Sequence, residues 1–500
     1  MFELSFANVL LFFSFFLTGV YFWNKHAFGY WKRRGVYSPP SQFLIGHLGP
    51  VALGKQSLGV RLMDVYTQTK DHAYVGIQLS VKKTLVINDL DMAKTVLLKD
   101  FDHFSSHGIK HSKEVDPLGE HLFNLDGEKW KKMRVKLTPT FTSSKMKFMF
   151  DTMLSCSHDM IDFVKGTAET GEISDIKEII AKFGTDVIGS CAFGIQTNSF
   201  KHPDAEFRRV GKDIFEATFL KMVLNTFAFI APNLVPKFLV KRAMGGIAEF
   251  FTRTVEETIA HREKNKIVRN DFLQLLIDMK NSDEKSGNHL TIEEIVPQVF
   301  VFFIAGFETS STAATYAFLE LARNQHIQEK AREHIDKAFE ECDGKITYET
   351  INQLSYLTQI VNESMRMYPP LPFLFRNCTK DYKIAGTETV IEKGTVVVIP
   401  ILGIQRNSKY YPDPLQFEPD RFSPENISKR HQYAHLPFGE GPRNCIGSRF
   451  GMMQVKLALF TILRSFHVDL VAESSGPVKF DPKAFLLHTE GEMLLKFTPR

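Results

Sequence analysis

One short stretch near the carboxyl end, residues 438–447, strongly limits what this chain can fold into. It reads Phe-Gly-Glu-Gly-Pro-Arg-Asn-Cys-Ile-Gly, so a single cysteine lies in a loop of glycine, proline and arginine. Glycines allow positive φ and let the backbone approach a bulky planar group closely. From Ser448 the apolar residues recur with helical spacing, so a thiolate at Cys445 would benefit from the positive end of a helix. Arg443 would add a guanidinium, which suits carboxylates.

The loop follows the pattern F-x-x-G-x-R-x-C-x-G and resembles the haem-binding loop of the cytochrome P450 superfamily at every defined position. The resemblance implies that Cys445 is the axial thiolate ligand of the iron in haem b. It also implies that Phe438, Arg443 and Gly447 belong to the cofactor site. From the residues alone, a buried structural cysteine in a glycine-rich turn is the alternative, because free cysteine often behaves as a small core residue.

A second motif, W-x-x-x-R, lies in residues 126–134. Trp130 and Arg134 are four residues apart and share one face of a helix that Asp126 can cap. The motif resembles the family's element that donates to a haem propionate. Several lysines surround the motif: Lys129, Lys131, Lys132, Lys136, Lys145 and Lys147. The resemblance implies that these lysines dock an acidic electron donor. On composition alone they form a solvated face.

A long apolar helix is predicted from residue 291 to about residue 321. Thr291 and Glu294 form a capping box at its start. Small residues in its middle predict a groove or a local bulge, and the sequence A-G-F-E-T there resembles the family's oxygen-activating motif. The resemblance implies that Thr309 hydrogen-bonds dioxygen and that Glu308 helps to relay protons. The alternative is a core helix whose threonine hydroxyl bonds back to its own backbone.

Two arginine motifs complete the resemblance. E-x-x-R at Glu363 and Arg366, with P-x-R-F around Arg421, resembles the family's buried Glu/Arg/Arg triad, to which we assign a structural role because buried charge needs pairing. By family position, the apolar residues 371–375 line the pocket and Arg376 holds a propionate.

Composition argues for one large domain and against several other classes. The 500 residues contain no repeat and no central linker, and the net charge of +4 is too small to indicate nucleic-acid binding. The five cysteines are scattered and odd in number, which argues against a disulfide framework or a zinc site. Histidines 72, 103, 107, 111 and 121 have no metal-ligand spacing, so we interpret them as surface residues.

The amino end predicts a membrane anchor. Residues 4–23 are almost wholly apolar, about 20 residues, and Lys25, Lys32, Arg33 and Arg34 follow. A cleaved signal peptide is the alternative, but the charges follow the apolar run and no A-x-A site is present. We therefore expect a transmembrane anchor at 1–23, a basic, proline-containing hinge at 24–50 and a catalytic domain at 51–500.

Short β-type runs are predicted at 74–79, 84–87 and 396–400. Residues 219–240 are apolar but contain Pro232 and Pro236, which excludes a spanning helix. The segment is either core or a lid that dips into the bilayer surface.

The resemblance as a whole implies a predominantly α fold with small β-sheets enclosing one haem, most like the insect microsomal, xenobiotic-metabolising P450s. It implies a monooxygenase that inserts one atom of O2 into apolar small molecules, xenobiotics or endogenous lipids and hormones. Without a dinucleotide fingerprint in the chain, electrons must come from a partner, implied to be NADPH–cytochrome P450 reductase, with cytochrome b5 as a further candidate. The implied location is the endoplasmic reticulum membrane, single-pass, with a cytosolic domain. A reductase-independent haem-thiolate isomerase or dehydratase and a haem sensor are the alternatives.

Overall fold

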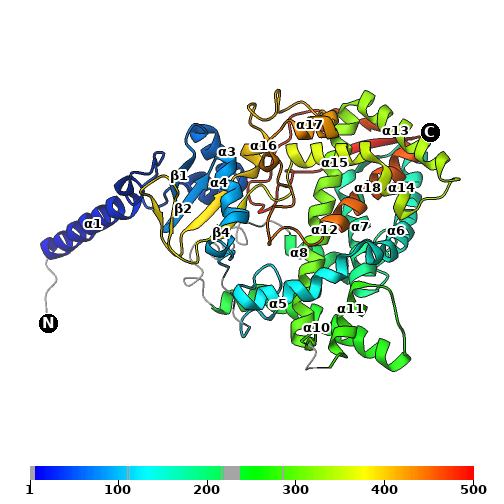
Figure 1. Ribbon diagram of the computed structural model, residues 1–500, viewed down its shortest axis with the longest axis horizontal. Coiled ribbons are helices and arrows are strands. Elements are labelled where there is room, and N and C mark those ends of the chain that lie inside the picture. Colours follow the sequence, from blue (N-terminus) through cyan, green and yellow to red (C-terminus); the bar gives the residue numbers. More distant parts are fainter. Residues whose placement is uncertain (1–5, 110, 112, 216–217, 219–236, 284–286) are drawn as a thin grey trace.

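The computed structural model describes residues 6–109, 111, 113–215, 218, 237–283 and 287–500. The chain forms a mostly helical body with small sheets, the largest of which lies on the side nearer the amino terminus, and helix α1 projects away from that side (Figure 1). This confirms the predicted mixture of helices and small sheets. Residues 219–236, which make up most of the segment expected to be core or a lid, lie outside the described residues.

Helices supply most of the structure, and several of them surround the site described below. Those assigned as α-helical are α1 (Phe6–Phe28), α2 (Gly49–Ala52), α3 (Leu58–Thr69), α4 (Leu90–Lys94), α5 (Gly127–Leu137), α6 (Ser143–Thr170), α7 (Ile176–Ile188), α8 (Glu206–Phe215), α10 (Lys237–Asn265), α11 (Phe272–Lys280), α12 (Ile292–Arg323), α13 (Gln325–Glu341), α14 (Tyr348–Gln353), α15 (Ser355–Met367), α16 (Ile401–Gln405), α17 (Pro424–Ser428) and α18 (Ser448–Ser465).

Three small sheets join distant parts of the chain. The largest has the order β1-β2-β7-β4, in which β2 and β7 pair in parallel and the other pairs are antiparallel. Its strands are β1 (Tyr74–Leu79), β2 (Lys82–Ile87), β4 (Leu374–Asn377) and β7 (Val396–Ile399). The second sheet has the order β3 (Ile173–Asp175), β9 (Leu494–Pro499), β8 (Phe466–Leu470). The third sheet pairs β5 (Tyr382–Lys383) with β6 (Val390–Ile391). The three predicted strands are therefore confirmed.

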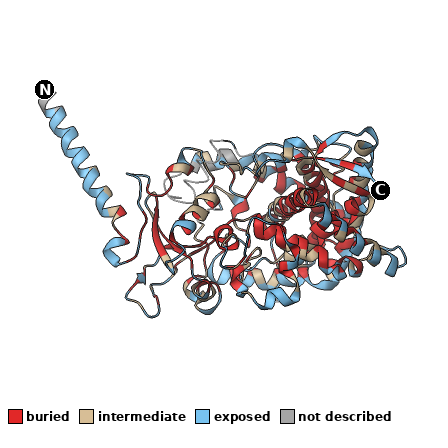
Figure 2. Cartoon of the chain, turned by 90° about the horizontal axis from the view of Figure 1, so that it is seen from above, coloured by how far each residue is buried: buried red, intermediate tan, exposed pale blue. Residues whose placement is uncertain are grey.

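Helix α12 is the centre of the core. Its start carries the predicted capping box between Thr291 and Glu294, with Pro297 in the early turns. It packs on α7, α15 and α18, and most of its residues are buried, the class drawn in red in Figure 2. Among the described residues it is long and apolar enough to span a membrane, but 67% of its most apolar stretch is buried inside the protein. It is therefore a core helix by its surroundings.

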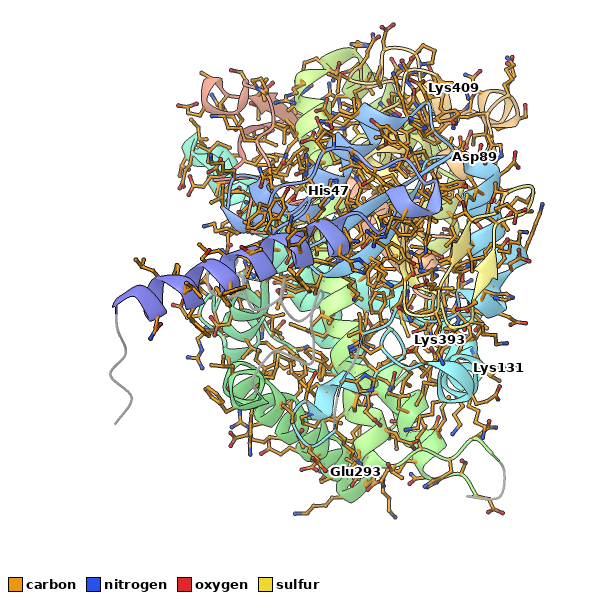
Figure 3. The ribbon with its side chains drawn as sticks, turned by 90° about the vertical axis from the view of Figure 1, so that its left-hand side faces the viewer. His47, Asp89, Lys131, Glu293, Lys393 and Lys409 are labelled. Carbon is orange, nitrogen blue, oxygen red and sulfur yellow. The ribbon has the colours of Figure 1, made fainter. Side chains whose placement is uncertain are left out.

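Helix α1 has the opposite environment. Its large apolar side chains from Leu10 to Trp23 are exposed, and the helix is pale along most of its length in Figure 2. The chain that follows is packed on the sheet: Trp31 is fully buried and its Nε1 donates to the Ile77 carbonyl at 3.0 Å. His47, labelled in Figure 3, accepts a hydrogen bond from the Gln78 N–H at 3.1 Å. Much of the segment expected as a hinge thus contacts β1.

Two expectations about side chains were wrong. His107 and His121 are buried, not on the surface, because the loop that carries them folds inward against α12. Asp126 occupies the residue before α5, but its carboxylate makes no capping hydrogen bond to the helix. That carboxylate accepts instead from the Ser106 hydroxyl at 2.6 Å and from Arg443 Nη2 at 3.0 Å.

Candidate functional site

The cysteine loop is a tight backbone turn immediately before α18. The Cys445 N–H donates to the Phe438 carbonyl at 2.8 Å, and the Asn444 N–H donates to the Gly441 carbonyl at 3.0 Å. Gly439 and Gly441 have φ of +67° and +77°, the region that favours glycine. At Gly441 a Cβ would lie 1.9 Å from the Leu97 carbonyl oxygen, so only glycine fits there. The loop is thereby fixed against residues 97–98.

The Cys445 side chain lines a cavity. Burial raises the pKa of its thiol, while a backbone hydrogen bond at Gly447 and the nearby charge of Arg134 oppose that rise. A thiol in this setting becomes a thiolate when it coordinates a metal ion, because metal binding releases the proton.

The cavity has a volume of about 320 Å³ and a largely apolar wall. Helix α12 contributes one side through Val301, Phe302, Ala305, Gly306 and Thr309. Every predicted cofactor residue lines the same space: Trp130, Arg134, Arg376, Phe438, Arg443, Cys445 and Gly447. Segments more than 300 residues apart in the sequence therefore meet here.

The middle of α12 is a regular helix without the bulge that was one of the two expectations, and its small residues Ala305 and Gly306 line the cavity. Gly306 also packs closely on α7: a Cβ there would lie 2.6 Å from the Cδ1 of Ile188, so that side chain would have to shift. The Thr309 hydroxyl donates to the Ala305 carbonyl at 2.6 Å, the backbone bond expected for a threonine in a helix. Thr309 lines the cavity, and its hydroxyl oxygen can still accept a hydrogen bond from a group in that cavity.

Glu308 is outside the cavity wall. Its Oε1 lies 2.9 Å from Nε2 of His488, and both side chains are mostly buried.

Three arginines reach the cavity and use their donors differently. Arg443 donates to the carbonyls of Ser105 and Leu125 at 2.5 and 2.6 Å and to Asp126, which clamps the loop before α5. Arg134 donates to the carbonyl and the side-chain oxygen of Asn444 at 2.9 and 2.7 Å.

Arg376 is the exception, because its charge has almost no partner. It is 2% exposed, its Nη1 donates to the Phe375 carbonyl at 2.8 Å, and its Nε has no hydrogen-bond partner among the described residues. Burial, with the charge of Arg443, lowers the pKa of Arg376 to about 9. A buried cation of this kind calls for an anionic ligand group.

The predicted triad is assembled behind the cavity. Arg366 donates from Nε and Nη2 to the two oxygens of Glu363 at 2.6 and 2.8 Å, and both side chains are fully buried. Arg421 Nε lies 3.5 Å from Glu363 Oε1. Arg366 also donates to the carbonyls of Gln405 and Pro414, so the group ties α15 to the segment that leads to the cysteine loop.

Comparison with known proteins gives the family. Residues 38–496 match the family model described as Cytochrome P450. The chain is 40% identical over 482 residues to Cytochrome P450 6a2 of Drosophila melanogaster, covering 94% of this chain and 95% of that protein. It is 39% identical over 504 residues to Cytochrome P450 6k1 of Blattella germanica, covering 96% and 95%. The chain belongs to the cytochrome P450 family.

As a P450, the chain is a monooxygenase, and its cofactor is haem b ligated by a cysteine thiolate. A P450 takes dioxygen, a small-molecule substrate and electrons from a redox partner. Its relatives named above are insect P450s, in line with the resemblance drawn from the motifs.

Sequence reasoning missed two residues of the P450 site. His107 lines the cavity, stacks on Phe123 and lies 3.4 Å from Arg443 Nη1. Gln298 is fully buried and joins α12 to the loop that carries His121: it accepts from the Leu122 N–H at 2.9 Å and donates to the Glu120 carbonyl at 3.1 Å. The signal for Gln298 was available, since it is a lone amide within an apolar helical run.

Proposed function

We propose that this P450 is a membrane-anchored, microsomal monooxygenase whose iron ligand is Cys445 and whose substrates are apolar small molecules. The observation that carries the proposal is the shared cavity, which Cys445 lines together with Ala305, Gly306 and Thr309 of α12. The thiolate supplies electron density that favours O–O cleavage once dioxygen is bound and reduced.

The basic residues of the cavity fit the two carboxylates of haem. Arg376 supports this most directly, because its buried guanidinium lacks a counter-ion among the described residues. Arg134 and Arg443 complete the basic rim, and the Trp130 ring beside them lies 4.4 Å from the Arg443 guanidinium carbon. Phe438 and Gly447 flank the ligand.

The remaining cavity wall selects the substrate. It is built from aromatic and aliphatic side chains, including Leu122, Phe123, Phe302, Leu371 and Leu374. Such a wall excludes water and offers few groups that would orient a polar ligand. Xenobiotics and endogenous lipids or hormones both have this character, and the proposal covers both.

Thr309 and Glu308 would manage protons. Thr309 faces the cavity, so its hydroxyl can hold a proton donor or water next to the reacting oxygen. Glu308 lies one residue back and is 17% exposed in its side chain, which suits exchange with solvent.

Electrons would come from NADPH–cytochrome P450 reductase, with cytochrome b5 as an optional second donor. Lys129, Lys131 and Lys132 are exposed on α5, and Lys131 points outward in Figure 3. Complementary charge across such an encounter raises the association rate. Lys136 contributes less, because its Nζ donates to the His289 carbonyl at 2.7 Å.

The anchor would be the segment 1–23, with α1 crossing the endoplasmic reticulum membrane once and residues 51–500 in the cytosol. The exposed apolar side chains of α1 and the basic residues at its end support this orientation. Residues 24–50 would join the anchor to the domain.

Reconstitution tests the proposal. The purified chain, reductase and NADPH should convert apolar test compounds to products with one added oxygen atom. Cys445→Ala should lose the red-shifted Soret band of the reduced carbon monoxide complex, and a retained band would refute the ligand assignment. Thr309→Ala should keep that band but divert more NADPH to hydrogen peroxide. A wild-type chain that rearranges peroxides and ignores NADPH would instead be an isomerase.

A further inference from the structure

The carboxyl-terminal loop 481–489 brings a histidine to the predicted proton-handling residue of α12. His488 Nε2 lies 2.9 Å from Glu308 Oε1, and each side chain is 17% exposed. No motif in the sequence joins these two residues, which lie 180 positions apart.

The backbone on either side of His488 is fixed in place. The Leu487 N–H donates to the Pro370 carbonyl at 3.0 Å, and the Tyr316 hydroxyl, also on α12, donates to the Leu487 carbonyl at 2.9 Å. The His488 carbonyl accepts from the Asp481 N–H at 2.9 Å. Tyr316 is buried and stacks on Tyr368 with ring centroids 4.3 Å apart, so the helix that carries Glu308 also holds the loop that carries His488.

The imidazole has one polar neighbour at its ε nitrogen. Nε2 is buried, and Glu308 Oε1 is the polar atom close to it, although the two are not aligned as a hydrogen bond in the described part of the chain. A carboxylate held this way has fewer rotamers open to it. Groups that act on a reacting atom lose much of their effect when their support is loosened by about 1 Å.

We propose that His488 is a positioning residue for Glu308: it holds the carboxylate at the solvent-side end of the proton path, from which Glu308 serves Thr309. The inference rests on the proposed function, because Glu308 matters to turnover only if dioxygen is activated in the cavity. His488 does not line the cavity and acts through Glu308.

Two substitutions separate positioning from packing. In His488→Gln the amide nitrogen takes the place of Nε2, so a donor to Glu308 is kept. In His488→Asn the amide nitrogen takes the place of Nδ1, so the contact is lost. Thr489→Val is the matched control, because its neighbouring hydroxyl is buried without a hydrogen-bond partner among the described residues.

The holoenzyme is assayed with reductase and NADPH, and the readout is product formed per NADPH oxidised. His488→Asn should lower this ratio several-fold and raise hydrogen peroxide, His488→Gln should restore most of it, and Thr489→Val should match wild type. All variants should keep the reduced carbon monoxide band. Equal ratios in wild type and His488→Asn, or no difference between Gln and Asn, would overturn the proposal.

A double-mutant cycle in thermal unfolding gives a readout independent of turnover. Shifts in Tm for His488→Asn and Glu308→Ala should be non-additive, since each substitution alone removes the same contact. Additive shifts would overturn the pairing. If wild type forms no product with reductase, the proposed function fails, whereas the cycle still decides whether His488 and Glu308 are coupled.

Discussion

Arg134 and Asn444 are joined by two hydrogen bonds, from Nη1 to the Asn444 carbonyl and from Nη2 to its side-chain oxygen. Asn444 immediately precedes Cys445, so helix α5 is fastened directly to the cysteine loop. The exposed lysines of α5 therefore lie on the same helix that contacts the cysteine loop.

Neutralising those lysines should slow electron delivery. Lys129→Gln, Lys131→Gln and Lys132→Gln together should reduce reductase-supported turnover several-fold and flatten its ionic-strength dependence, because surface charges act mainly on encounter. The measurement is the initial rate at several salt concentrations. Turnover driven by added peroxide should change little, and an equal loss in both assays would indicate damage to the haem site.

Removing the buried charge at Arg376 should weaken haem retention. Arg376→Gln takes away the guanidinium that we assign to a haem carboxylate, so haem should transfer faster to apomyoglobin and the haem-to-protein ratio should fall. Arg332→Gln is the control, because Arg332 is equally buried but lies in α13 and outside the cavity. Similar haem loss from both variants would mean that Arg376 contributes only to packing.

Breaking the triad should destabilise the fold. Glu363→Ala leaves Arg366 fully buried without its carboxylate, which typically costs about 3–5 kcal/mol. The free energy of unfolding from urea titration is the measurement. Asp420→Ala removes an exposed partner of Lys330 and should have little effect. A cost for Glu363→Ala no larger than that of the control would contradict the structural role.

Stability should fall in mild acid because of a buried histidine. Burial lowers the pKa of His435 to about 3, and both ring nitrogens lack hydrogen-bond partners among the described residues. Between pH 6.5 and that value the unfolded chain binds a proton that the folded chain does not, so the free energy of unfolding decreases as pH falls, by about 1.4 kcal/mol per pH unit.

His435→Phe should therefore reduce that slope by about 1.4 kcal/mol per pH unit in urea titrations between about pH 6 and pH 4. Phe422→Leu is the control, since its ring centroid lies 4.5 Å from the imidazole and it does not titrate. An unchanged slope in His435→Phe would show that the imidazole is protonated in the folded state.

Three sequons, at Asn362, Asn377 and Asn426, report on topology. Asn426 is exposed on α17, so an enzyme in the lumen of the endoplasmic reticulum could reach it. With the domain in the cytosol, endoglycosidase should cause no mobility change in chain made in eukaryotic cells. A shift mapped to Asn426 would reverse the proposed orientation.

The motifs could be found from sequence because each is local. Residues 438–447, the capping box at Thr291 and the pair Glu363–Arg366 each depend on spacing within a few residues. His107, Gln298 and His488 depend on contacts with residues far away in the chain. A histidine in a polar loop has the same neighbours in sequence whether it is exposed or buried. Asp126 shows the same limit: its position at the start of α5 was evident, but its carboxylate is taken by Arg443.

The parallel pairing of β2 with β7 has a consequence for biosynthesis. The register joins Val86 to Val398, so one edge of the amino-terminal sheet has no partner until about 310 further residues have been made. At roughly 5–20 residues per second, that delay is roughly 15–60 s. During this time β2 presents open backbone groups that invite pairing with other chains. Nascent copies on one polysome are therefore at risk of cross-pairing, and chaperone binding to residues 74–87 would protect them.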